Sequence, residues 1–76
     1  MKRSYVVSSN IVSIGYSRRD RILEVEFLWG GIYQYYGVPR SVRDRLAKAD
    51  SKGQYLNAHI RDHYEYELIH APTHAS

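Results

Sequence analysis

Apolar and polar residues alternate along the first half of the chain, and this period predicts β-strands. The clearest run is RILEVEFLW, residues 21–29, in which Glu24 and Glu26 interrupt a row of apolar side chains. That row is Leu23, Val25, Phe27 and Trp29. Residues 10–16 alternate in the same way, and the polar segment RRDR at 18–21 predicts a turn between the two strands.

Two glycines, residues 30–31, predict a hairpin turn into a third strand that carries Tyr33, Tyr35 and Tyr36. A two-residue loop would leave Tyr33 and Tyr35 beside the glutamates of the preceding strand. A three-residue loop, with a glycine in the left-handed conformation, reverses this parity. We favour the longer loop, because it leaves the Gln34 amide in solvent, where it needs no buried partner. Tyr33 and Tyr35 are then core residues, and Tyr36 faces outward.

Residues 39–50 predict a helix that follows the tyrosine strand directly. Pro39 suits the first position of a helix, where its missing N–H costs nothing. Val42, Leu46 and Ala49 lie at helical spacing and predict one buried stripe.

Ser51 predicts the start of a second helix, with Gln54 completing a capping box. This helix is expected to present three residues to the sheet: Leu56, Ile60 and Tyr64. The alternation of Tyr64, Tyr66 and Leu68 allows a short fourth strand, and residues 70–76 read as a loose tail.

These elements predict an α+β fold, a three-stranded antiparallel meander, with a possible short fourth strand, carrying two helices packed on one face. The chain of 76 residues has room for one domain, whose core spans about residues 8–69. Composition adds one unusual feature, since the chain has eight tyrosines against one Phe and one Trp. Tyrosine rings must therefore fill part of the core.

The chain contains no cysteine, which excludes disulfides and thiolate metal sites and suits a reducing compartment. It also has no run of the roughly 20 apolar residues that a membrane span needs. We therefore expect a cytoplasmic protein with no membrane partner.

No set of residues predicts catalysis or a cofactor. His59 and His63 are four residues apart on the predicted second helix, but zinc needs a third and usually a fourth ligand. We expect these histidines to lie at the surface and expect no metal. The sequence has neither a nucleophile elbow nor a glycine-rich phosphate loop, so we expect the protein not to be an enzyme.

Positive charge is concentrated in residues 1–52, which hold ten Lys or Arg against five Asp or Glu. Residues 53–76 hold one arginine against three acidic residues. A phosphate backbone would be attracted to such a surface, although a solvated helix face explains the charges equally well. The candidate phosphate contacts are Arg18, Arg19, Arg21, Arg40, Arg43, Lys48, Lys52 and Arg61. Tyr36 is the candidate for base stacking, and Trp29 either stacks or closes the core.

Four segments, SSNIVSIGY, LEVEF, YQYYGVP and ADSKGQYLNAHIR, together resemble the KTSC domain. This small module is found at the C-terminus of some lysyl-tRNA synthetases and as single-domain bacterial proteins. The resemblance covers residues 8–61 and places the motif of the family on Tyr33, Tyr35, Val38, Pro39, Ser51, Gly53, Tyr55 and Asn57. Arg61 matches the basic residue that follows the helix isoleucine. The resemblance implies a single-domain protein of bacterial or phage type that binds RNA, and it does not imply an enzyme.

The leading hypothesis is therefore a module for RNA or another single-stranded nucleic acid. The alternative is a module for protein interaction, which self-associates through an open sheet edge or docks a partner on residues 51–57.

Overall fold

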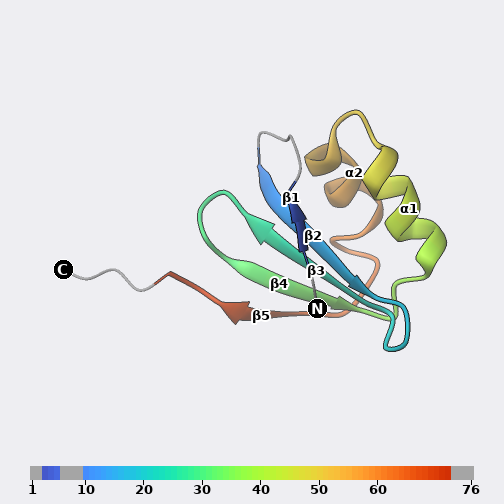
Figure 1. Ribbon diagram of the computed structural model, residues 1–76, viewed down its shortest axis with the longest axis horizontal. Coiled ribbons are helices and arrows are strands. Elements are labelled where there is room, and N and C mark those ends of the chain that lie inside the picture. The colour runs from blue at the N-terminus through green and yellow to red at the C-terminus, as the bar shows by residue number, and fades with distance from the viewer. Residues whose placement is uncertain (1–2, 6–9, 73–76) are drawn as a thin grey trace.

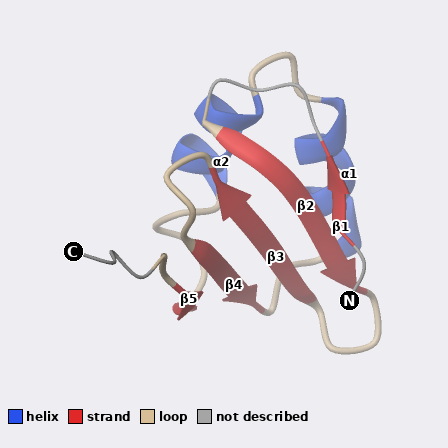
Figure 2. Cartoon of the chain, turned by 60° about the vertical axis from the view of Figure 1, so that its left-hand side comes forward, coloured by secondary structure: helices blue, strands red, loops and turns tan. Residues whose placement is uncertain are grey.

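The computed structural model describes residues 3–5 and 10–72 and shows a single antiparallel sheet with two helices on one face (Figure 1). The strands follow one another in chain order. They are β1 (Arg3–Tyr5), β2 (Ile11–Ser17), β3 (Ile22–Phe27), β4 (Ile32–Tyr36) and β5 (Tyr66–His70). Helices α1 (Arg40–Lys48) and α2 (Lys52–His59) connect β4 to β5 and cover the same face of the sheet (Figure 2). The predicted α+β class and the meander are confirmed.

The predicted strands correspond to β2, β3 and β4, and the possible fourth strand corresponds to β5. Strand β5 begins and ends two residues later than predicted, so it includes His70, which had been assigned to the tail. Strand β1 was not predicted, because RSY is too short to show alternation. It pairs with residues 13–15 of β2 and makes the sheet five-stranded.

The turn between β3 and β4 has the predicted three-residue loop. The Phe27 N–H donates to the Gly31 carbonyl at 2.8 Å, and the Gly30 N–H donates to the Phe27 carbonyl at 2.9 Å. Gly30 has a φ of 103°, a region that favours glycine. Trp29 lies in this turn and is 55% exposed, so its predicted place in the buried row of β3 is wrong.

This loop fixes the register of the tyrosine strand. Tyr33 pairs with Val25, and Tyr35 pairs with Leu23, so both rings lie on the helix side of the sheet. Tyr35 is 3% exposed and belongs to the core, while Tyr33 is partly buried against it. The prediction that both phenols turn inward is confirmed. Gln34 lies on the opposite face, where its amide donates to the Glu24 carboxylate at 3.0 Å.

Strand β2 contains a β-bulge between Ile11 and Ser13. An extra residue in a strand reverses the side to which the following residues point. Ile11 and Ile14 are therefore both buried in the core, although an odd number of positions separates them.

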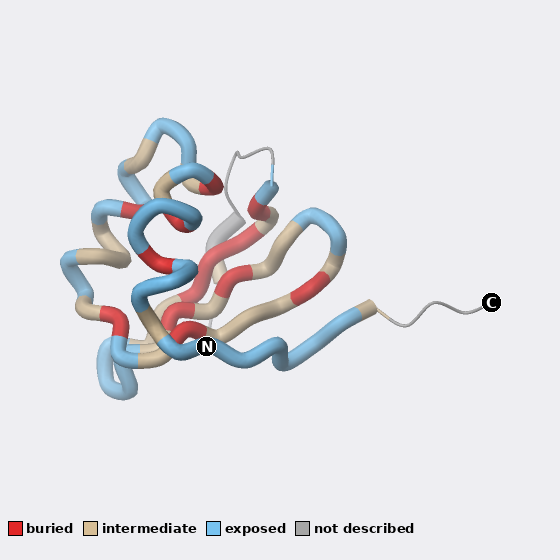
Figure 3. Tube along the Cα trace, turned by 180° about the vertical axis from the view of Figure 1, so that it is seen from behind, coloured by how far each residue is buried: buried red, intermediate tan, exposed pale blue. Residues whose placement is uncertain are grey.

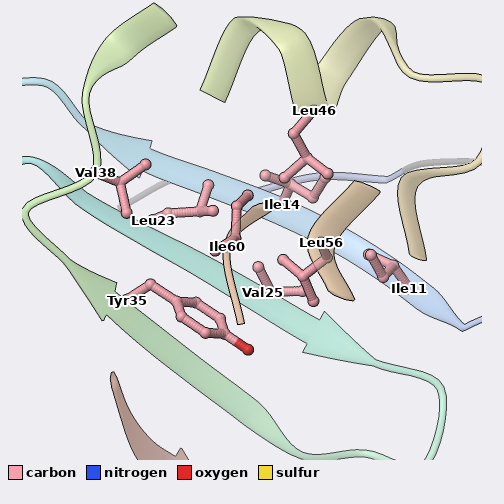
Figure 4. Packing of buried hydrophobic residues seen from close by; sticks show 9 residues of the cluster. All are labelled: Ile11, Ile14, Leu23, Val25, Tyr35, Val38, Leu46, Leu56 and Ile60. Atoms are coloured by element: carbon pink, nitrogen blue, oxygen red, sulfur yellow. The ribbon is translucent and has the colours of Figure 1, made fainter. Parts of the chain in front are cut away.

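The two helices close the core from one side (Figure 4). From α1, Leu46 is fully buried, and Leu56 of α2 and Ile60 at its end pack beside it. Ser51 caps α2 by accepting a hydrogen bond from the Gln54 N–H at 3.4 Å. Because α2 ends at His59, Tyr64 reaches the core from the loop that follows and not from the predicted helix.

The buried segments of the chain lie between the sheet and the helices, whereas β5 is exposed along its whole length (Figure 3). No helix within residues 3–5 and 10–72 is long and apolar enough to cross a membrane.

Candidate functional site

Five of the predicted phosphate contacts gather at the end of the sheet where β2 turns into β3 and β4 leads into α1 (Figure 1). We call this surface the basic corner, and it consists of Arg18, Arg19, Arg21, Arg40 and Arg43. The antiparallel register brings its two segments together, because Ile22 at the start of β3 pairs with Tyr36 at the end of β4. The Val38 N–H also donates to the carbonyl of the turn residue Arg21 at 3.0 Å.

The turn side of the basic corner carries exposed and unpaired charge. Arg18, Arg19 and Arg21 are exposed and form no ion pair with any residue that the structure describes. The acidic residue of the same turn, Asp20, is held by Ser17, whose hydroxyl donates to its carboxylate at 3.2 Å. These three guanidinium groups are therefore free to meet an anion.

The helix side of the basic corner is partly neutralised. Arg40 and Arg43 both lie near the Asp44 carboxylate, at 3.8 Å and 3.0 Å. The Arg43 guanidinium also lies 5.2 Å from the centre of the Tyr16 ring, a cation–π contact that fixes its position. With Asp20 and Asp44 counted against its five arginines, the basic corner keeps an excess of three positive charges.

Lys48 and Lys52 lie outside the basic corner, and Tyr36 pairs with Ile22 beside it but turns its ring to the sheet face away from the helices. Lys48 ends α1, and Lys52 begins α2, where its ammonium donates to the Ala49 carbonyl at 3.2 Å. Tyr36 is on the sheet face away from the helices, and its hydroxyl donates to the Glu67 carboxylate at 3.2 Å. Loss of hydration and the Glu67 charge raise the pKa of Tyr36. The predicted stacking residue thus stands on an acidic face, apart from the arginines of α1.

Arg61 belongs to a second surface, a hollow of about 220 Å³ on the helix side of the sheet. We call it the aromatic hollow. Residues from β3, the β3–β4 turn, β4, α2, the loop after α2 and β5 line it: Phe27, Trp29, Tyr33, Tyr35, Leu56, Asn57, Arg61 and Tyr66. Tyr35 lies at the margin of the apolar cluster (Figure 4). It also lines the hollow.

Tyr33 is the centre of the aromatic lining. Its ring meets Phe27 edge to face at a centroid distance of 5.5 Å, Tyr66 at 5.7 Å and Trp29 at 6.3 Å. Such contacts favour a fixed arrangement of rings over free rotation. Trp29 and Tyr66 are nevertheless 55% and 54% exposed, so both of these lining residues present surface to solvent.

Polar groups in the aromatic hollow have no partner in the described part of the chain. This holds for the Tyr35 hydroxyl, the Asn57 amide and the Arg61 guanidinium. Burial, assisted by Tyr33, raises the pKa of Tyr35 to about 12, and the positive charge of Arg61 opposes this rise. Asn57 and Arg61 are exposed, so their polar groups can bind water or a ligand at the hollow.

The family motif residues fall into two groups. Some line the hollow or the recess beside it, and the others pack in the core or lie at the starts of the helices. Tyr33, Tyr35 and Asn57 line the hollow, and Gly53 lines the recess beside it. A Cβ on Gly53 would stand 3.0 Å from the Asn10 amide nitrogen, so glycine allows this close approach of α2.

The remaining motif residues stabilise the core and the helix starts. Val38 is buried in the core, Pro39 precedes α1, and Ser51 caps α2. Tyr55 packs against the core and stacks on His59, with ring centroids 4.5 Å apart.

Sequence reasoning missed the aromatic hollow as a site. Trp29 was expected in a strand, and Tyr66 was noted only as part of a possible strand. The inward parity of Tyr33 and Tyr35 was the one signal that could have located it.

The predicted pairing of His59 and His63 on one helix face is wrong, because α2 ends at His59. A His63 ring nitrogen lies 3.2 Å from the Ala58 carbonyl. Within the described ranges, no group of three or more His, Cys, Asp or Glu side chains could hold a metal ion.

Comparison with known proteins shows what the chain is similar to. The KTSC domain family matches residues 7–64. An uncharacterized protein of Stutzerimonas stutzeri is 43% identical over 70 residues, which cover 91% of this chain and 99% of that protein. The crystal structure of a KTSC domain protein from Yersinia pestis superposes with a TM-score of 0.88 at 38% identity, covering 91% of this chain and 97% of that one.

A lysine–tRNA ligase of Nostoc punctiforme is 37% identical over 61 residues. These residues cover 80% of this chain but only 11% of the ligase. The similarity therefore concerns one small segment of that enzyme.

Proposed function

The chain belongs to the KTSC domain family, and from this membership and its surface charge we propose that it is a non-enzymatic module that binds single-stranded RNA. The observation that carries the proposal is the basic corner, where five arginines face two acidic residues. Its three exposed turn arginines form no ion pair with any described residue. A phosphate group that binds them therefore displaces water and breaks no ion pair with those residues.

Two further observations support RNA over duplex DNA. The arginines lie on a turn and on the first turn of a short helix, and such an arrangement does not insert a helix into a major groove. A segment similar to this chain also occurs in a lysine–tRNA ligase, an enzyme whose name includes a transfer RNA. Because the chain has no cysteine, we place this activity in the reducing cytoplasm.

The test is the binding of a fluorescein-labelled, mixed-sequence RNA strand, followed by fluorescence anisotropy at 50 mM and 200 mM salt. Five phosphate contacts on a single strand predict a slope of about −3.5 for the logarithm of affinity against the logarithm of salt concentration. Affinity should then fall about 100-fold across this range.

Two double variants distinguish the effect of the basic corner on RNA binding from the effect of the total positive charge. Replacing Arg18 and Arg19 by Gln should reduce the salt slope to about −2, because each phosphate contact contributes about 0.7. Replacing Arg45 and Lys48 by Gln removes the same charge from the exposed end of α1 and should change the slope little. An affinity indifferent to salt, or equal losses in the two double variants, would contradict the proposal.

Self-association is the second candidate, and the exposed strand β5 favours it. This strand ends the sheet and presents Tyr66, Leu68 and Ile69 to solvent. Pairing of two β5 edges would bury these side chains. Size-exclusion chromatography with light scattering distinguishes the two candidates: a stable dimer supports self-association, and a monomer that binds RNA supports the first proposal.

A further inference from the structure

We propose that the aromatic hollow holds one unpaired base of the bound RNA strand, with Arg61 contacting the phosphate next to that base. This inference rests on the proposed function and adds to it a second site. The basic corner would supply sequence-independent attraction, whereas the hollow would recognise that the strand carries an unstacked base.

The size of the hollow suits a single planar group. Pockets for drug-sized ligands measure about 300–1,000 Å³. The hollow, at about 220 Å³, is smaller than these, and the Trp29 and Tyr66 rings of its lining are partly exposed. It therefore fits a group of the size of one base.

The aromatic lining supplies surfaces on which a base can stack. Tyr33 is held by edge contacts to its neighbours, and this fixes the floor of the hollow before a ligand arrives. Trp29 and Tyr66 keep half of their surface exposed and can close on a base from either side. Because stacking depends on a π-face, this part of the site accepts any base.

The polar groups supply hydrogen bonds to the edge of the base. The Asn57 amide can donate and accept, as base edges require. The Tyr35 side chain is 3% exposed, and its hydroxyl, which has no hydrogen-bond partner among the described residues, remains protonated at neutral pH. It can therefore donate to a carbonyl or ring nitrogen.

The charge of Arg61 distinguishes a nucleotide from an apolar peptide. Arg61 is the single basic residue of the hollow, and it forms no ion pair in the part of the chain that the structure describes. An apolar side chain in the hollow would gain nothing from this guanidinium, whereas a nucleotide brings a phosphate beside its base.

The experiment uses Trp29, the single tryptophan of the chain, as a direct reporter. A mixed-sequence RNA strand should quench or shift Trp29 fluorescence, and an abasic sugar–phosphate strand of equal length should not. Both strands should bind the basic corner with the same dependence on salt. A fluorescence change of equal size with the abasic strand would overturn the inference.

Three substitutions test the lining. Trp29→Ala and Tyr66→Ala should each weaken RNA binding about 5- to 150-fold, the contribution of stacking one base, and leave the salt slope unchanged. Arg61 adds a sixth phosphate contact, which makes the salt slope of the parent protein about −4.2, and Arg61→Gln should weaken binding and return the slope to about −3.5. Ile69→Ala, an exposed residue of β5 outside the hollow, is the matched control and should bind as the parent protein does.

The outcomes separate the two proposals. If the parent protein binds no RNA, the proposed function and this inference both fail. If it binds RNA with the expected salt slope but Trp29→Ala and Tyr66→Ala bind equally well, only the hollow is refuted. Circular dichroism of each variant checks its fold, and the comparison of base-containing and abasic strands on the parent protein needs no variant.

Discussion

Replacing Gly30 by Ala should destabilise the whole domain, because the turn at Gly30 sets the register of the tyrosine strand. The φ of 103° at this position disfavours any residue with a Cβ, at a cost of about 1–2 kcal/mol. In addition, the new methyl group would stand 2.9 Å from the Pro72 Cγ atom. We expect the free energy of unfolding to fall by about 2 kcal/mol, a large share of the roughly 4–11 kcal/mol expected for a domain of this length.

Urea unfolding followed by circular dichroism measures this loss. Gly37→Ala is the control, because Gly37 has a φ of 75° but no atom within 4 Å of the position of a Cβ. It should lose about 1 kcal/mol through backbone strain alone. The reasoning would be refuted if Gly30→Ala were as stable as the parent protein, or if Gly37→Ala lost more stability than Gly30→Ala.

Two further predictions concern single polar groups. Because the pKa of Tyr35 is raised to about 12 in the folded state from its ordinary value of 10, its phenol favours folding below pH 10. As pH rises from 10 to 12 the parent protein should lose up to about 2–3 kcal/mol that Tyr35→Phe does not lose, which urea unfolding across this range would detect. Ser51→Ala should cost about 1 kcal/mol by removing the cap of α2, and Ser51→Asp should restore it; equal thermal stability of both variants would contradict this.

The sequence predicted the elements that local patterns specify. Alternation of apolar and polar residues predicts strand β3, and the capping serine Ser51 predicts the start of α2. Even the inward parity of Tyr33 and Tyr35 could be predicted, because Gln34 between them has no place under a sheet. In each case the deciding residues are neighbours along the chain.

Features that depend on distant partners could not be predicted. The bulge that brings both Ile11 and Ile14 into the core is visible only against the register of β3. Strand β1 forms by pairing with the edge of β2. Its own three residues are too few to show the alternation that predicts a strand. The aromatic hollow needs Trp29 of the β3–β4 turn to meet Arg61 and Tyr66, which lie more than 30 positions later, and no spacing rule connects them.

The candidate phosphate contacts illustrate the same limit. Charge counts identified the arginines, but only the pairing of Ile22 with Tyr36 shows that the turn arginines and those of α1 share one corner. Tyr36 was chosen correctly as an outward ring, yet a contact with Glu67, more than 30 positions later, gives it an acidic neighbour.

The order of the strands has a consequence for how this chain reaches its native state. Each strand pairs with the next one in sequence, with helices inserted only before the last. Contacts between residues close in sequence require little loop-closure entropy, and low contact order goes with fast folding. Such a segment can acquire its shape without waiting for distant parts of a polypeptide, a property that suits a unit recurring both by itself and inside a much longer enzyme.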